Sequence, residues 1–298
     1  MRKFLSILLV TAFLLLLTAC QSTPTQSVES AIPPGTPQSL KFGYGIKLST
    51  QQANVEASLH VAARNGLSWV LLEFNWSAAQ PTPDAWTLPP NFSHALETAR
   101  SLGLFTLVSV QNPPDWALTP AGPDAEQTAQ LALKLTLLDT PPTALELFPA
   151  ANTRAGWGAA PNPAAYARLF ETVRRQLETK ELPVYLVAGG LHNNLSEPDT
   201  IRDVDFLSQL YTTGLRPDII SIQLETLTGD PLAAPAPNTL RHYEEVRAVM
   251  NAHEHDDGLL WITHFNLVPE NEKETWLKEA HAIMQSQLYL GAVFWDGE

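Results

Sequence analysis

The sequence has a single cysteine and few basic residues. Its 298 residues include one Cys and 18 Lys and Arg against 31 Asp and Glu, and its formal charge is −13 at pH 7. One cysteine excludes an intramolecular disulfide framework. Phosphate contacts require clustered basic side chains, and no basic run occurs beyond the first three residues, so we predict no nucleic-acid partner. Because 45% of the residues are hydrophobic, the chain can bury a large core.

The sequence also has no apolar run long enough to cross a bilayer comfortably. Arg2 and Lys3 precede apolar residues 4–17, a pattern typical of a signal peptide. Residues 17–20 (LTAC) resemble the lipobox of bacterial lipoproteins. The resemblance implies cleavage after residue 19, a lipid on Cys20 and an extracytoplasmic place on the cell membrane. Residues 20–40, rich in Ser, Thr, Pro and Gln, are typical of a tether.

From residue 41 to 298, apolar runs typical of strands alternate with amphipathic stretches typical of helices. We expect strands over 41–47, 68–73, 104–110, 143–148, 183–188, 218–223, 259–263 and 291–295, with helices between them. Such apolar strands need cover on both faces, which helical crossovers between parallel strands supply. Eight repeats predict an α/β domain of the closed (β/α)₈ barrel type. The alternative is an open doubly wound sheet, but the glycines at 43 and 45 lie within the first strand and not at a helix start.

The last expected strand has no helix after it, since three residues follow Trp295. Its outer face then lacks the cover that a following helix gives each strand of such a barrel. We expect this face to be covered by the tether, a second subunit or another protein. The alternative is that the neighbouring helices close over a short strand.

Aromatic and polar residues follow several strands at their carboxyl ends, where the loops of a barrel form its pocket. Aromatic rings offer apolar faces that suit the C–H faces of sugars. We therefore predict a carbohydrate-binding rim formed by Trp76, Trp116, Trp157, Phe265 and Trp295. The polar candidates at the same ends are Asn75, Asn152, His192, Asn193, Asn194, Gln223, Glu225 and His264.

Short motifs of this domain resemble the retaining glycoside hydrolases of the cellulase and β-xylosidase type. They are GYG at 43–45, residues 69–76 with Pro81, PDWA at 114–117 and WIT at 261–263. The resemblance spans residue 41 to the end. It implies a (β/α)₈ barrel with two catalytic glutamates, an acid/base after strand four and a nucleophile after strand seven, and a carbohydrate partner.

Both glutamate positions carry other residues. Residues 146–152 read ELFPAAN, so Phe148 and Asn152 match the motif of the family while Ala150 takes the acid/base position. Residues 263–266 read THFN, which places His264 at the nucleophile position. Asn75 replaces the strand-two arginine of the family. Retaining hydrolysis needs two carboxyls about 5–5.5 Å apart, so the sequence predicts that this chemistry is lost.

Other acids leave an alternative open. Glu225, Asp296 and Asp115 lie near the strand ends. An inverting mechanism needs no nucleophilic side chain and tolerates about 6.5–9.5 Å between two carboxyls. Glu146 lies on the order of 13 Å deeper than Ala150, at about 3.3 Å per strand residue, so we expect it to be a hydrogen-bonded interior carboxylate. The segment 253–258 (HEHDDG) reads as a helix end and turn, so we predict no metal site.

The sequence thus predicts a membrane-anchored, glycoside-hydrolase-like barrel that binds carbohydrate without retaining hydrolysis and without a cofactor. Two alternatives remain open. One is an active glycosidase that uses rim carboxylates, and the other is a scaffold that recognises another protein.

Overall fold

The computed structural model describes residues 42–52, 54–193, 198–267 and 273–296. The expected signal peptide, the lipidation site Cys20, the tether and Asn194 lie outside these ranges. Within them, no helix has the length and apolar character needed to cross a membrane.

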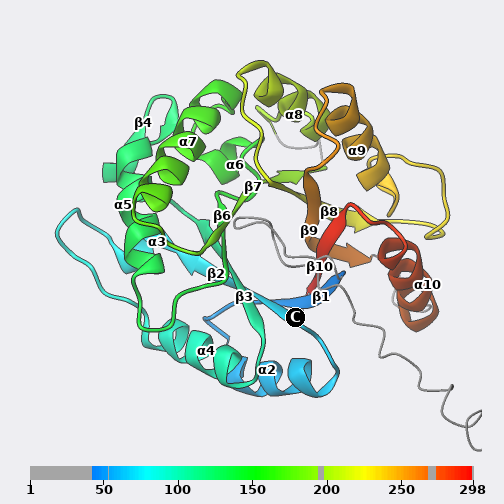
Figure 1. The fold of residues 1–298 in the computed structure, drawn as a ribbon, viewed down its shortest axis with the longest axis horizontal. Coiled ribbons are helices and arrows are strands. Elements are labelled where there is room, and N and C mark those ends of the chain that lie inside the picture. The colour runs from blue at the N-terminus through cyan, green and yellow to red at the C-terminus, as the bar shows by residue number, and fades with distance from the viewer. Residues whose placement is uncertain (1–41, 53, 194–197, 268–272, 297–298) are drawn as a thin grey trace, which may run out of the picture. The chain divides into compact units, whose positions relative to one another are not determined.

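Eight parallel strands close into a barrel (Figure 1). Their order around the barrel is β1-β10-β9-β8-β7-β6-β3-β2. The strands are β1 (Gly43–Leu48), β2 (Trp69–Asn75), β3 (Phe105–Gln111), β6 (Ala144–Leu147), β7 (Tyr185–His192), β8 (Ile219–Leu227), β9 (Leu259–Leu267) and β10 (Leu290–Asp296). A small antiparallel pair, β4 (Leu118–Thr119) and β5 (Gly122–Pro123), follows β3. The predicted (β/α)₈ barrel is confirmed.

Helices surround these strands (Figure 1). The longer helices are α2 (Val55–Arg64), α4 (Pro90–Ser101), α5 (Ala125–Thr136), α7 (Pro163–Thr179), α8 (Asp203–Thr212), α9 (His242–Ala252) and α10 (Lys273–Gln285). Three short helical turns follow strand ends: α3 (Trp76–Ala79), η1 (Asp115–Ala117) and α6 (Arg154–Trp157). Side-chain caps start several helices. The Asn162 Oδ1 atom, for example, accepts a hydrogen bond from the Ala165 N–H at the start of α7, at 2.9 Å.

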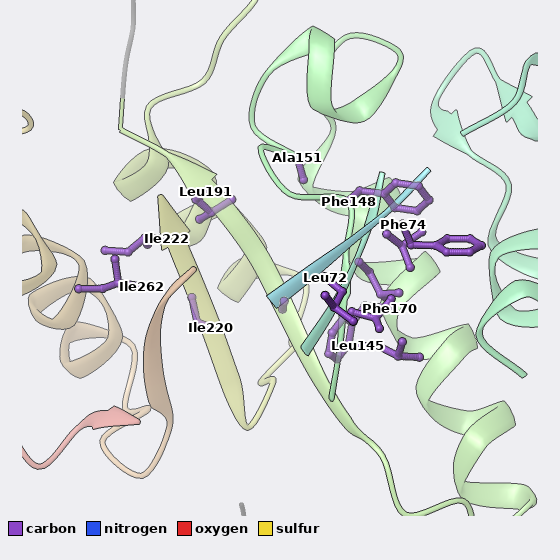
Figure 2. Packing of buried hydrophobic residues seen from close by; sticks show 14 of the residues in the cluster. Leu72, Phe74, Leu145, Phe148, Ala151, Phe170, Leu191, Ile220, Ile222 and Ile262 are labelled. Atoms are coloured by element: carbon purple, nitrogen blue, oxygen red, sulfur yellow. The ribbon is translucent and has the colours of Figure 1, made fainter. Parts of the chain in front are cut away.

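Apolar side chains fill the layer between the strands and the helices. Leu72 on β2, Leu145 on β6 and Phe170 on α7 belong to one buried cluster (Figure 2). Their neighbours along the strands point the other way, because successive strand residues face opposite sides of a sheet. Because apolar clusters lie on both faces of the strands, residues of both orientations are apolar and each strand reads as a nearly continuous apolar run.

A second apolar cluster fills the lower part of the barrel interior. Leu71 and the rings of Trp69, Trp261 and Phe294 belong to it. The Trp69 and Trp261 ring centroids lie 5.0 Å apart. Gly45 on β1 makes room for these rings, since a Cβ atom there would lie 2.7 Å from Phe294 Cδ1 and 2.9 Å from Trp69 Cβ. These rings fill this end of the barrel interior, so the space inside the barrel that remains for a ligand lies toward the carboxyl ends of the strands.

The neighbouring elements bury much of β10. Val293, which belongs to the cluster between strands and helices, has no exposed surface. The half-buried Trp295 ring lies 4.7 Å from the Phe265 ring. Val293 belongs to the same cluster as Trp276, Ala280 and Met284 of α10, so this helix contributes to the cluster that buries the outer face of β10.

The fit between Gly45 and the interior rings predicts a measurable cost of a larger residue. Gly45→Ala should lower the free energy of unfolding by about 1–3 kcal/mol, because the added methyl group overfills a packed interior. Urea unfolding measures this change. As a control, Ala57→Val on the exposed face of α2 should change stability by less than about 1 kcal/mol. Equal stability of Gly45→Ala and the parent protein would contradict the packing argument.

Candidate functional site

A cavity of about 280 Å³ opens at the carboxyl ends of the strands, where (β/α)₈ barrels place their active sites. We call it the central cavity. Leu71 joins its lining to the apolar interior below. Its charged and amide-bearing side chains are Lys47, Glu73, Gln111, Asn112, Glu146, Gln223, Glu225 and His264.

Ala150 is among the residues that line this cavity, and its side chain is a single methyl group. It follows β6 with a φ of +59°, in the left-handed region, and its N–H donates to the Gly190 carbonyl oxygen at 2.7 Å. A methyl group can neither donate a proton nor attack carbon. The wall therefore has no acid group at the position where the family resemblance places the acid/base.

His264 lies between two carboxylates. Its Nδ1 atom is 3.5 Å from Glu225 Oε1, and its Nε2 atom is 3.2 Å from Asp296 Oδ2. The second Glu225 oxygen, Oε2, lies 2.9 Å from the Nε2 atom of His192. These four residues form a chain of alternating imidazoles and carboxylates, which we call the polar chain. The hydrogen bond from His192 holds the pKa of Glu225 below its ordinary value, although burial opposes this shift.

Two buried amides hold the polar chain in place. The Asn152 side chain accepts from the His192 N–H at 2.8 Å and donates to the His192 carbonyl at 2.9 Å. The Asn193 side chain accepts from the Glu225 N–H at 3.1 Å and donates to the Glu225 carbonyl at 3.3 Å. Neither amide is among the residues that line the central cavity. We expected both as sugar contacts, but each is occupied by backbone groups and acts as a positioning residue.

Glu146 lies at the floor of the central cavity and is fully buried. Its Oε2 atom accepts from the Ser109 hydroxyl at 2.6 Å, and its Oε1 atom accepts from the Ser221 and Thr263 hydroxyls, each at 2.8 Å. Burial raises the pKa of this carboxyl, and the three hydrogen bonds oppose the shift only in part. The expected hydrogen-bonded interior position of Glu146 is confirmed. The central cavity nevertheless reaches down to it, since Glu146 and Ala150 both line the cavity.

The expected aromatic rim differs from what the structure describes. Trp76, Trp157 and Phe265 have no exposed surface, so their faces are not available to a ligand. Two of the tryptophans donate their indole N–H groups to backbone carbonyls of loops instead. Trp157 Nε1 donates to the Ala121 carbonyl at 2.8 Å, and Trp116 Nε1 donates to the Gln80 carbonyl at 3.0 Å. The described residues that line the central cavity include no aromatic ring except the His264 imidazole.

Two other expected residues lie away from the central cavity. Asn75 caps α3, because its Oδ1 atom accepts from the Ala78 N–H at 3.1 Å and the Ser77 hydroxyl at 2.9 Å. It lines a neighbouring groove, and Leu71 and Glu73 are the β2 residues that reach the central cavity. Asp115 is exposed in η1 and is not among the lining residues.

Sequence reasoning missed several polar residues of the central cavity, among them Lys47, Glu73 and Gln111. Lys47 Nζ lies 3.2 Å from Glu73 Oε1. Glu73 on β2 is the register partner of Ser109 on β3, and it lies two positions after Leu71, as Gln111 lies two positions after Ser109. Strict alternation along these strands is the signal that could have found them, because it places residues 71, 73, 109 and 111 on the inner face.

Comparison with solved structures supports the fold. A family 39 glycoside hydrolase from Bacteroides cellulosilyticus superposes with a TM-score of 0.66 at 13% identity, covering 85% of this chain and 56% of that chain. A family 128 endo-β-1,3-glucanase from Sorangium cellulosum superposes with a TM-score of 0.55 at 18% identity, covering 86% and 88%. For a monomeric β-xylosidase from Caulobacter crescentus the TM-score is 0.62 at 11% identity, with 87% and 60% covered.

At these identities the likeness shows a shared glycoside hydrolase barrel fold and no more. The chain spans little more than half of the family 39 enzyme and 60% of the β-xylosidase. No protein-family model matches the sequence, and no curated protein matches it.

The buried state of Glu146 predicts how stability varies with pH. Its raised pKa means that the folded protein retains a proton that the unfolded chain releases near its ordinary value of 4.5. This residue therefore makes stability fall as the pH rises from that value through the raised pKa, by up to about 1.4 kcal/mol per pH unit. Glu146→Gln should remove this slope in urea unfolding between pH 4 and 8.

The matched control is Glu126→Gln on the exposed surface of α5, which should keep the slope of the parent protein. Parallel curves for Glu146→Gln and the parent protein would show that this carboxyl does not titrate differently in the folded state.

Proposed function

We propose that the barrel binds carbohydrate in the central cavity and does not hydrolyse it by the retaining mechanism. The observation that carries this proposal is the combination of Ala150 on the cavity wall with His264 held between Glu225 and Asp296. The glycoside hydrolase fold of the structural neighbours supports carbohydrate as the ligand class.

Retaining hydrolysis requires one carboxyl to donate a proton and a second to attack carbon. The described lining contains three carboxyls, and each is engaged by the protein. Glu73 pairs with Lys47, Glu146 accepts from three hydroxyls, and Glu225 accepts from His192. A positioned general acid contributes roughly 10²–10⁴ in rate. Glu146 has a raised pKa, but it is fully buried and its oxygens are engaged by three hydroxyls at the cavity floor.

The lining is suited to a polyhydroxylated ligand. Gln111 and Gln223 offer amide donors and acceptors, and Lys47 offers a donor next to Glu73. The volume of about 280 Å³ lies near the lower end of small-molecule sites, roughly 300–1,000 Å³. The central cavity therefore fits a ligand on the scale of one sugar ring.

The polar chain disfavours the alternative of an active inverting glycosidase. In such an enzyme a sugar and a water molecule occupy the space between the two carboxyls. Glu225 and Asp296 are on opposite sides of the His264 imidazole, which fills the space between them. The lowered pKa of Glu225 also makes it a poor proton donor at neutral pH.

The lipid anchor on Cys20 and an extracytoplasmic place on the membrane are parts of the same proposal. They rest on the sequence of residues 1–40. A protein anchored in this way would present the central cavity to carbohydrate outside the cell.

The proposal predicts binding without turnover. Calorimetric titration with cello-, laminari- and xylo-oligosaccharides should give saturable binding to one of these series, and aryl glycosides should not be cleaved. Gln223→Ala should weaken binding by about tenfold, the effect of one lost hydrogen bond. Gln130→Ala, on the exposed face of α5, is the matched control and should bind like the parent protein.

Two outcomes would contradict this function. Turnover that disappears on Glu225→Gln would establish the active glycosidase instead. Absence of binding across the whole panel would leave the protein-recognition scaffold as the better account.

A further inference from the structure

A groove of about 510 Å³ adjoins the central cavity. It lies between the residues after β1, the ends of β2 and β3, and the first turn of α4. Glu73, Gln111 and Asn112 line both spaces. These three side chains are half-buried or exposed. The boundary between the groove and the central cavity therefore consists of polar groups that a ligand in either one can contact.

The chemistry of the groove is neutral and polar. Thr50, Gln51 and Asn91 contribute hydroxyl and amide groups, and Pro89 and Pro90 contribute apolar ring faces. Among the described residues that line the groove, Glu73 is the only ionisable one, and Lys47 Nζ lies 3.2 Å from its Oε1 atom. With no basic residue in the lining and a formal charge of −13 on the chain, a polyanion is disfavoured.

We propose that this groove extends the central cavity and binds further units of a neutral oligosaccharide. The inference rests on the proposed function and deepens it. The groove has nearly twice the volume of the central cavity, so it holds about two units where the cavity holds one. The ligand is then a chain of at least three sugars that crosses the ends of β2 and β3, and not a free monosaccharide.

The dependence of affinity on chain length tests this inference. The probes are glucose, xylose and the cello-, laminari- and xylo-oligosaccharides of two to six units, titrated into the full protein. Affinity for the series that binds should rise at least tenfold from one to three units. Ala78 lines the groove, is exposed on α3 and does not line the central cavity, so Ala78→Trp blocks the groove alone.

Ala78→Trp should remove the gain with length and leave affinity for the single sugar within twofold of the parent protein. Ala57→Trp, which places the same ring on the exposed face of α2, is the matched control and should keep the full gain. A second variant, Gln51→Ala with Asn91→Ala, removes two exposed amides from the groove without adding bulk. This double variant should reduce the rise in affinity from one to three sugar units severalfold. It tests the groove also if Ala78→Trp does not fold.

Each contrary outcome has a separate meaning. Affinity that does not change with length, or a gain that survives in both groove variants, would overturn the groove and leave the proposed function in place. Equal weakening of the single sugar and the longer chains by Ala78→Trp would also overturn it. Absence of binding to every probe would overturn both proposals.

Discussion

The buried Glu146 carboxyl group links four strands of the barrel. It joins β6 to Ser109 on β3, Ser221 on β8 and Thr263 on β9 through three short hydrogen bonds. Apolar rings fill the interior below it, and polar side chains line the space above it. A buried carboxyl is costly unless its oxygens are satisfied, so these hydroxyls determine where the cavity floor can lie. The volume and polarity of the central cavity depend on this junction.

Above that floor, β9 carries His264 at the nucleophile position of the family resemblance, and the polar chain continues onto β7, β8 and β10. The Asn152 and Asn193 side chains hydrogen-bond to the backbones of His192 and Glu225, respectively. The His192 side chain contacts Glu225, and His264 contacts Asp296 at the other end of the polar chain. Such a network orders its members against one another. The His264 imidazole lies between Glu225 and Asp296, so these two carboxyls do not face a sugar from two sides.

The sequence predicted the barrel well because every strand alternates with a helix and is apolar on both faces. It also indicated that Ala150 and His264 lie in the cavity, through their positions after strands four and seven. The aromatic rim was not predictable in the same way. Composition does not say whether a ring at a strand end faces the cavity or packs beneath a loop, and Trp76 and Trp157 do the latter. The amides have the same ambiguity, since backbone groups of distant strands are their partners.

The central claim is that the barrel cannot form a covalent glycosyl-enzyme intermediate. Intact-protein mass spectrometry after incubation with activated 2-deoxy-2-fluoro glucosides and xylosides tests it most directly, because such sugars become trapped on the nucleophile of a retaining enzyme. The account predicts an unchanged protein mass. A mass increase of one fluorosugar, located on a carboxylate of the central cavity, would contradict it.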